Sequence, residues 1–117
     1  MYNKDRIYTD YIIDMLNAIE KIQQKTKGIS KEELDKDEDL CLLLERLFEI
    51  LGEAANRIPK ELHSKFPNIP WGSIIGMRNI IIHAYDKIDT IYLWNAIKHK
   101  FDNLKSELSI VKENIDK

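Results

Sequence analysis

Residues 40–58 read LCLLLERLFEILGEAANRI, and this stretch decides the fold. Its apolar residues recur every three or four positions, as they do along one face of an α-helix. The positions on that face are Leu40, Leu43, Leu44, Leu47, Ile50, Leu51, Ala54 and Ile58. Gly52 lies inside the pattern and costs about 0.5–1 kcal/mol relative to alanine. Close approach of another helix is the usual reason for such a glycine, although an unoptimised position would look the same.

Helical periodicity continues towards the N-terminus. Two neighbouring stripes of apolar residues predict a helix that is buried on more than one side and that Gly28 ends. The stripes are Ile7, Tyr11, Met15, Ala18 and Ile22, and beside them Tyr8, Ile12, Leu16 and Ile19. Ser30 and Glu33 match a capping box and predict one short helical turn. The acidic residues 37–39 then place negative charge where the dipole of the next helix favours it.

Prolines and a heptad-like seam predict the helices of the C-terminal half. Pro59 is expected to open a short helix to about Ser64, and Pro70 another that runs towards His83. A last helix is expected to begin near Asp86 or Asp89. Its seam consists of Trp94, Ile97, Phe101, Leu104, Leu108 and Val111. With no alternating strand pattern or repeat in view, we predict an all-α, up-and-down bundle of four to five helices, with residues 1–117 forming one domain.

Composition narrows the possible functions. The 117 residues are 44% hydrophobic and 32% charged, which is typical of a globular protein, and the formal net charge is −2. No global basic field therefore indicates nucleic acid, so any contact with RNA has to be local or built from two subunits. No apolar stretch approaches the roughly 20 residues that span a membrane, and no leader segment is visible. We expect a cytoplasmic protein without a membrane contact, in which the single cysteine, Cys41, is buried.

Residues 76–85, GMRNIIIHAY, gather polar functional groups at the end of an apolar helix. Asn79 and His83 share a helical face, whereas Arg78 and His83 lie about 140° apart around the axis. Histidine suits proton transfer near neutral pH, and arginine binds phosphate oxygens and stabilises developing charge. Asn79 would orient the histidine or bind the phosphate. This combination fits RNA cleavage without a metal or cofactor, because ribose supplies its own nucleophile.

Each of these residues also has a plain structural interpretation. His83 would serve equally as a partner of the helix dipole, and Tyr85 as a core residue with a wet hydroxyl. Arg46, Glu49 and Glu53 share one helical face, either as a solvated stripe with internal ion pairs or with Arg46 joining an RNA cleft. His63 and His99 are expected at the surface, and Trp71 in the core or an interface. No spacing typical of metal ligands is present.

A family resemblance favours the catalytic interpretation. The spacing of Arg78, His83 and Tyr85 resembles the R-x4-H-x-Y signature of the HepT-like branch of HEPN proteins. Three further blocks resemble that family in the same order along the chain. They are residues 51–55 (LGEAA), residues 66–71 with 76–79 (FPNIPW and GMRN) and residues 89–94 (DTIYLW). The resemblance therefore covers nearly the whole chain.

The resemblance implies a function and partners. It implies a homodimeric ribonuclease toxin that a small nucleotidyltransferase antitoxin of the MNT type neutralises. It assigns catalysis to Arg78 and His83, and to Tyr85 the position that the antitoxin modifies with AMP. Asn79 and Arg46 are then candidate supporting residues. Two alternatives stay open: a non-catalytic helical partner of a nucleotidyltransferase, and a nucleotide-binding subunit of a minimal nucleotidyltransferase.

Overall fold

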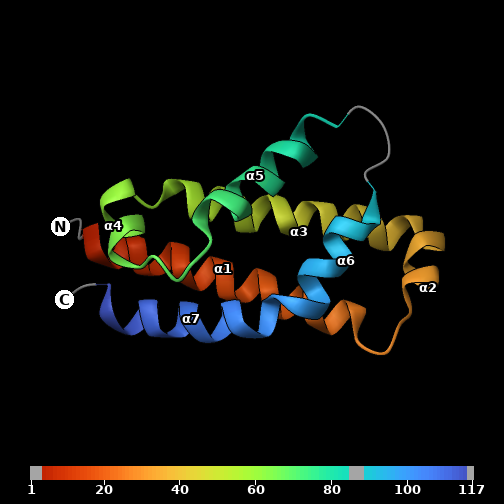
Figure 1. The fold of residues 1–117 in the computed structure, drawn as a ribbon, viewed down its shortest axis with the longest axis horizontal. Coiled ribbons are helices and arrows are strands. Elements are labelled where there is room, and N and C mark those ends of the chain that lie inside the picture. Colours follow the sequence, from red (N-terminus) through yellow and green to blue (C-terminus); the bar gives the residue numbers. More distant parts are fainter. Residues whose placement is uncertain (1–3, 85–88, 116–117) are drawn as a thin grey trace.

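The computed structural model describes residues 4–84 and 89–115. All regular structure in these two ranges is helical, which confirms the predicted all-α class (Figure 1). The helices are α1 (Lys4–Thr26), α2 (Lys31–Lys36), α3 (Glu38–Arg57), α4 (Lys60–Lys65), α5 (Trp71–Ile82), α6 (Thr90–His99) and α7 (Phe101–Asn114). The longer helices form the bundle, and α2 and α4 are short connecting helices. None of the helices within these ranges is long and apolar enough to cross a membrane.

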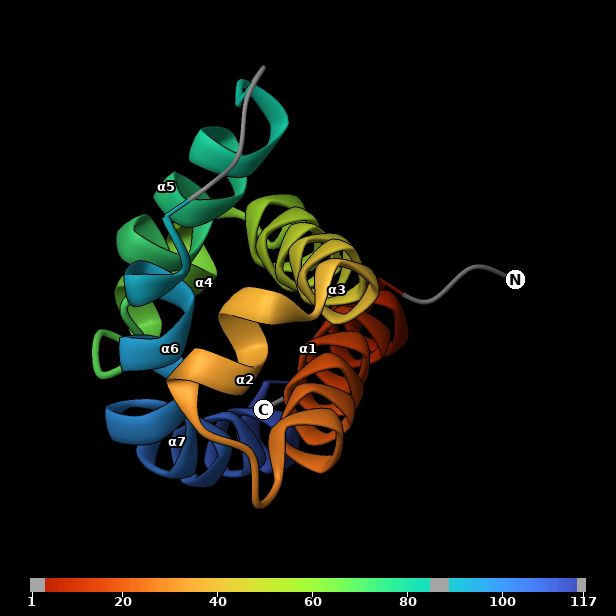
Figure 2. The same ribbon diagram turned by 90° about the vertical axis from the view of Figure 1, so that its right-hand side faces the viewer.

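Helix α1 lies between α3 and α7 and runs antiparallel to both (Figures 1 and 2). Residues from both of its predicted stripes are fully buried, among them Met15 and Ile22 from one stripe and Ile12 and Ile19 from the other. This confirms that α1 is covered on more than one side. Because α5 packs on the other flank of α3, the helices follow one another in the packing order α7, α1, α3 and α5.

The helix ends follow the signals in the sequence. The hydroxyl of Ser30 accepts a hydrogen bond from the Glu33 N–H, and the Glu33 carboxylate accepts one from the Ser30 N–H, both at 3.1 Å. Asp37 caps α3 by accepting the Leu40 N–H at 3.0 Å. Gly28 follows α1 with a φ of +76°, a left-handed conformation that glycine adopts readily. The predicted capping box and helix stop are therefore confirmed.

The prediction of one continuous last helix is wrong. Asp89 caps α6 as expected, but the helix breaks at Lys100, where φ is −123°, and α7 then begins at Phe101. Contacts with different partners hold the two halves. The Thr90 hydroxyl at the start of α6 donates to the Asp35 carboxylate on α2, whereas the Phe101 ring at the start of α7 stacks on Phe48 of α3. No glycine or proline marks the break, so local sequence gave no warning of it.

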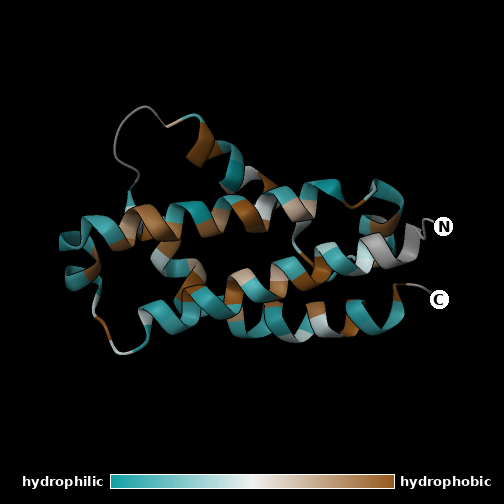
Figure 3. Ribbon diagram, turned by 180° about the vertical axis from the view of Figure 1, so that it is seen from behind, coloured by the Kyte–Doolittle hydropathy of each residue, from teal (hydrophilic) through white to brown (hydrophobic). Residues whose placement is uncertain are grey.

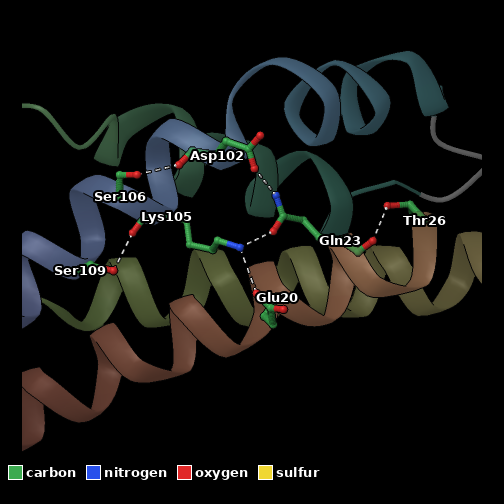
Figure 4. A network of polar contacts seen from close by, with 7 residues as sticks. All are labelled: Glu20, Gln23, Thr26, Asp102, Lys105, Ser106 and Ser109. Carbon is green, nitrogen blue, oxygen red and sulfur yellow. Dashed lines mark hydrogen bonds and ion pairs between the residues drawn. The ribbon is translucent and has the colours of Figure 1, made fainter. Parts of the chain in front are cut away.

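Polar contacts fix α7 against α1 (Figure 4). Asp102 accepts a hydrogen bond from the Gln23 amide at 2.9 Å. Lys105 donates to the same amide group at 2.9 Å and pairs with Glu20 at 3.0 Å. One side of the first turn of α7 is therefore bonded to α1, and these bonds set the rotation of α7 about its own axis.

The connection into α5 is rigid. The Trp71 indole N–H donates to the Phe66 carbonyl at 3.0 Å. Trp71 is buried in the core, which is one of its two expected positions, the other being an interface. His63 stacks on the Trp71 ring at a centroid distance of 4.4 Å, and its Nε2 lies 2.9 Å from the Ala55 carbonyl. The expectation that His63 is a surface histidine is therefore wrong. The side chain is half-buried because it fills the space between the end of α3 and the start of α5.

Gly52 of α3 is the point where α5 comes closest. A Cβ atom added at Gly52 would lie 2.2 Å from the Arg78 Cβ and 2.9 Å from the Arg78 Cγ. It would also lie 3.1 Å from the Ile74 carbonyl oxygen. The glycine thus accommodates the backbone and stem of α5, which confirms close helix approach as the reason for its presence.

We predict that Gly52→Ala lowers the free energy of unfolding by about 1–3 kcal/mol, the usual cost of overpacking a close contact. The strain arises because a backbone carbonyl and a Cβ, not a flexible side-chain end, meet the new methyl group. Urea unfolding followed by circular dichroism measures the difference. Gly72→Ala is the matched control: its Cβ would meet nothing within 4 Å, so its effect is expected within about 0.5 kcal/mol. Equal effects of the two substitutions would contradict the role assigned to Gly52.

Candidate active site

Arg78 is held between α5 and α3. Its stem lies against Gly52, and its side chain is 26% exposed. The Nη1 group donates to the Asn79 Oδ1 at 2.9 Å, and Nη2 lies 4.0 Å from the Glu53 Oε1. Two neighbouring groups therefore restrain the guanidinium near the surface, where an anion can still reach it.

The Nε of Arg78 is buried and has no hydrogen-bond partner among the described residues. An unsatisfied buried donor generally costs about 1–3 kcal/mol, and more when it is charged. Such groups are rare in folded proteins and call for an explanation such as a functional role. Arg78 is thus held in place at an energetic cost, which distinguishes it from an ordinary surface arginine.

His83 ends α5. Its backbone has φ −100° and ψ 4°, and its N–H donates to the Asn79 carbonyl at 3.2 Å. The imidazole is exposed and takes part in no hydrogen bond or ion pair within residues 4–84 and 89–115. The side chain of Asn79 therefore contacts Arg78, whereas its carbonyl makes only the regular helical hydrogen bond with the His83 N–H. The structure does not bring the guanidinium and the imidazole into contact, as their separation around the helix axis predicts.

The last turn of α5 is apolar and extends beyond the neighbouring helices (Figure 3). Ile81 is buried, but Ile80 is 58% exposed and Ile82 is 40% exposed. Exposed large apolar side chains that flank polar functional groups are typical of binding surfaces. The candidate residues Asn79 and His83 thus lie within a partly apolar surface.

The remaining predicted residues fall outside this contact. Tyr85 lies outside the described residues. Arg46 is exposed and pairs with Glu49 at 3.2 Å, and no hydrogen bond within the described residues joins it to Arg78. It lies on the same flank of α3 as Glu53, because seven residues are close to two helical turns. The Arg46–Glu49 pair agrees with the interpretation of this flank as a stripe with internal ion pairs.

Sequence reasoning did not identify Glu53 as the partner of Arg78. The available signal was Gly52, which indicates where a second helix approaches. A residue next to such a glycine lies about 100° further around the helix, at the edge of the contact. That geometry directs Glu53 towards the approaching helix, but nothing local shows which residue of that helix it meets.

The flank of α3 beside the candidate site is acidic. Burial raises the pKa of the Glu45 carboxyl above its usual value of 4.5, and the charge of Glu49 one turn away raises it further. Further along the same helix, the Glu53 carboxylate lies 4.0 Å from the Arg78 Nη2 and places negative charge beside the guanidinium. One copy of the chain therefore presents little net positive charge at this site. Among the described residues, no group of three or more His, Cys, Asp or Glu side chains is arranged to hold a metal ion.

Comparison with known proteins places these residues in context. Residues 15–111 match the family model described as "Ribonuclease HepT-like". The chain is 36% identical over 101 residues to "Putative RNase MJ1380" of Methanocaldococcus jannaschii, covering 86% of this chain and 93% of that protein. It is 35% identical over 102 residues to "Probable ribonuclease HepT" of Thermococcus cleftensis, covering 87% and 93%. "Putative RNase TTE0752" of Caldanaerobacter subterraneus is 35% identical over 107 residues, covering 92% and 93%. No solved structure matches.

We predict that Glu45→Gln stabilises the protein at neutral pH. The raised pKa means that the folded state favours the protonated carboxyl, so the wild type loses stability as the pH rises from 4.5 through the folded-state pKa. The gain from the substitution is expected at pH 7 and should shrink towards zero below about pH 4, where the carboxyl is protonated in both states. Urea unfolding at both pH values measures it.

The control for this prediction is Glu113→Gln, which makes the same charge change at an exposed position of α7. A gain at pH 7 that is equal in both variants would reflect net charge alone. That outcome would contradict a specific cost of burying Glu45.

Proposed function

The chain belongs to the HepT-like ribonuclease family, and on this premise we propose that it is an endoribonuclease whose active site is formed by Arg78 and His83. The observation that supports this assignment is the state of Arg78. Its guanidinium is restrained by Asn79 and Glu53, and its Nε is buried without a partner among the described residues. The chain thus presents an anion-binding group and an exposed proton-transfer group on one turn-and-a-half of helix, with the family's spacing between them.

The proposed reaction uses the ribose as nucleophile. The 2′-oxygen attacks the adjacent phosphorus, the bond from phosphorus to the 5′-oxygen breaks, and a cyclic phosphate and a 5′-hydroxyl result. His83 takes the proton from the 2′-hydroxyl or delivers one to the leaving oxygen. Arg78 stabilises the negative charge that develops on the phosphate oxygens. Neither a metal nor a cofactor is needed for these steps, and Asn79 keeps the guanidinium in place.

The proposal includes a homodimer with both motifs in one cleft. Three observations support it. Glu53 lies beside Arg78, the chain has a net charge of −2, and Arg78 and His83 point in different directions around α5. In one copy, the positive charge available to RNA is small and the two candidate catalytic groups face different directions. Two copies would bring two Arg78 side chains into a shared groove. The exposed Ile80 and Ile82 would be covered in that arrangement.

The proposal also includes control by a partner. We place the chain in a toxin–antitoxin pair with a cognate MNT-type nucleotidyltransferase that attaches AMP to Tyr85. Tyr85 follows His83 by two residues in the sequence. An AMP group there would add bulk and a phosphodiester negative charge close to the catalytic residues. Both effects oppose RNA, because the adduct repels the phosphate that Arg78 would bind.

We predict that Arg78→Ala and His83→Ala each reduce RNA cleavage by about 10²-fold or more, the typical contribution of a general acid–base or charge-stabilising group. Cleavage of a labelled single-stranded RNA by purified protein measures the loss. Lys112→Ala is the control, because it removes an exposed cation of α7, a helix that does not carry the candidate residues. EDTA is expected to leave the rate unchanged. Full activity of His83→Ala, or a need for added divalent metal, would contradict the mechanism.

Mixing the two inactive variants tests the shared cleft. If one subunit contributes Arg78 and the other His83 to the same site, a mixture of Arg78→Ala and His83→Ala protein should recover about a quarter of the wild-type activity. Half of the dimers formed at random are mixed, and each mixed dimer keeps one of its two composite sites intact. Absence of recovery in a dimer of proven mixed composition would contradict a composite site. Binding of ATP without any RNA cleavage by the wild type would favour the nucleotide-binding alternative.

We predict that coexpression with the neighbouring nucleotidyltransferase adds one or more AMP-sized masses to the chain. Intact-mass spectrometry detects them, and peptide mapping should place them on Tyr85. Tyr85→Phe should lack the addition and keep its RNA-cleaving activity in the presence of the partner. A wild-type chain that is fully neutralised without any added mass would refute the modification and leave steric blocking by the partner.

A further inference from the structure

A cavity of about 350 Å³ lies between α5 and the junction of α6 and α7. Its apolar lining comes from both sides of that gap and from α3. The main contributors are Phe48, Leu51, Ile74, Met77, Phe101 and Leu104. The volume is at the small end of the range for ligand pockets, which suits an occupant of about mononucleotide size.

Polar side chains also line the cavity. They are Asn68, Ser73, His99, Lys100 and Asn103, and all five are exposed. In the part of the chain that the structure describes, none of these side chains takes part in a hydrogen bond or an ion pair. Two amides, a hydroxyl, an imidazole and an ammonium group therefore line an apolar space at its solvent-facing mouth, where a ligand can replace the water around them. Apolar walls with a few convergent polar groups are typical of ligand-binding sites.

The fold holds these groups in place. Asn68 lies in the connection before α5, which the Trp71 indole fastens to the Phe66 carbonyl. On α7, Asp102 and Lys105 are committed to α1 (Figure 4). Asn103 is rotated about 100° from Asp102 around the helix, which leaves it free to line the cavity.

We propose that this cavity binds one unstacked nucleobase of a single-stranded RNA, with Lys100 beside an adjoining phosphate. The inference deepens the proposed function and rests on it. Proteins that read single-stranded RNA place the base on apolar or aromatic surfaces and satisfy its edge with side-chain hydrogen bonds. Here the walls of the cavity are apolar, with the buried Phe48 and Phe101 rings packed on each other at its base, and the two amides at the mouth offer donors as well as acceptors.

The charge and chemistry at the mouth favour a nucleotide over other occupants. Lys100 is a cation without a carboxylate partner among the described residues, so it can pair with a phosphate. An aliphatic ligand would make no use of the five polar groups, and an acidic peptide would place charge against the apolar walls. A base with its attached phosphate can occupy the apolar space and bind the polar groups at the mouth.

The position relative to the candidate active site fits one continuous strand. Met77 lines the cavity and directly precedes Arg78 in the chain. His83 follows Met77 by six positions, which corresponds to about 9 Å along the axis of α5. A base in the cavity would therefore belong to a nucleotide close to the cleaved bond. Such a site would make cleavage depend on the identity of that base.

The first experiment measures binding of AMP, GMP, CMP and UMP to the full chain by NMR chemical-shift titration. We expect at least one nucleotide to shift signals of Ser73, Asn103 and Lys100. Asn103→Leu should weaken that binding about tenfold or more, as loss of a base-reading contact does. Lys100→Gln should weaken nucleotide binding less than Asn103→Leu does, and its effect should become smaller as the salt concentration rises. The charge-matched control Lys112→Gln should leave binding unchanged. Shifts confined to residues outside the cavity, or no shifts with any of the four, would overturn the proposal.

The second experiment follows cleavage of RNA pools that are randomised around one cleavage site. The wild type should prefer particular bases at one position near the cut. Ser73→Trp, which narrows the mouth, and Asn103→Leu should raise KM and flatten that preference, and Lys112→Gln should retain it. RNA cleavage with a base preference that survives both cavity variants would overturn the cavity proposal and leave the ribonuclease intact. Nucleotide binding in the cavity by a protein that does not cut RNA would overturn the proposed function and support only the site.

Discussion

The close contact between α3 and α5 at Gly52 is the constraint on which the rest of the site depends. Because Gly52 has no Cβ, the backbone of α5 at Ile74 and the stem of Arg78 come within van der Waals distance of α3. This approach fixes where Arg78 leaves the helix and brings its guanidinium to Glu53. It also fixes the direction of α5, so that the last turn with Asn79 and His83 extends beyond the other helices (Figure 1).

The same contact has opposite consequences for binding and for folding. An arginine with a buried, unpartnered Nε and a carboxylate beside it is an unfavourable element of a fold. It is a favourable element of a phosphate site, because its orientation is already set before the anion arrives and little side-chain entropy remains to be lost. Helix α5 also buries the apolar side chains of Trp71, Ile74 and Ile81, and this burial offsets the cost.

Sequence predicts those features that depend on neighbours along the chain. The capping box at Ser30, the acidic start of α3 at residues 37–39 and the stop at Gly28 are local, and each lies where the sequence indicates. The break at Lys100 could not be predicted, because separate contacts with α2, α1 and α3 impose it and the heptad-like seam runs through it unchanged. The Arg78–Glu53 contact and the stacking of His63 on Trp71 were missed for the same reason. Each joins residues whose proximity exists only once two helices have packed.

The break at Lys100 and the cavity have one physical origin. A continuous last helix would keep residues 90–114 on one straight axis, and it could not satisfy both Thr90 at α2 and Asp102 at α1. The bend satisfies both, and it leaves the junction of α6 and α7 facing α5 across a space that side chains do not fill. The bend also leaves Lys100 at the mouth of that space. This is the side of α5 on which Met77 and Ser73 lie, and it is away from the Arg78–Glu53 contact. A chain with a net charge of −2 can attract RNA only through such local groups. Placing one cation on each side of α5 lets a single strand that crosses this helix meet positive charge at two successive points.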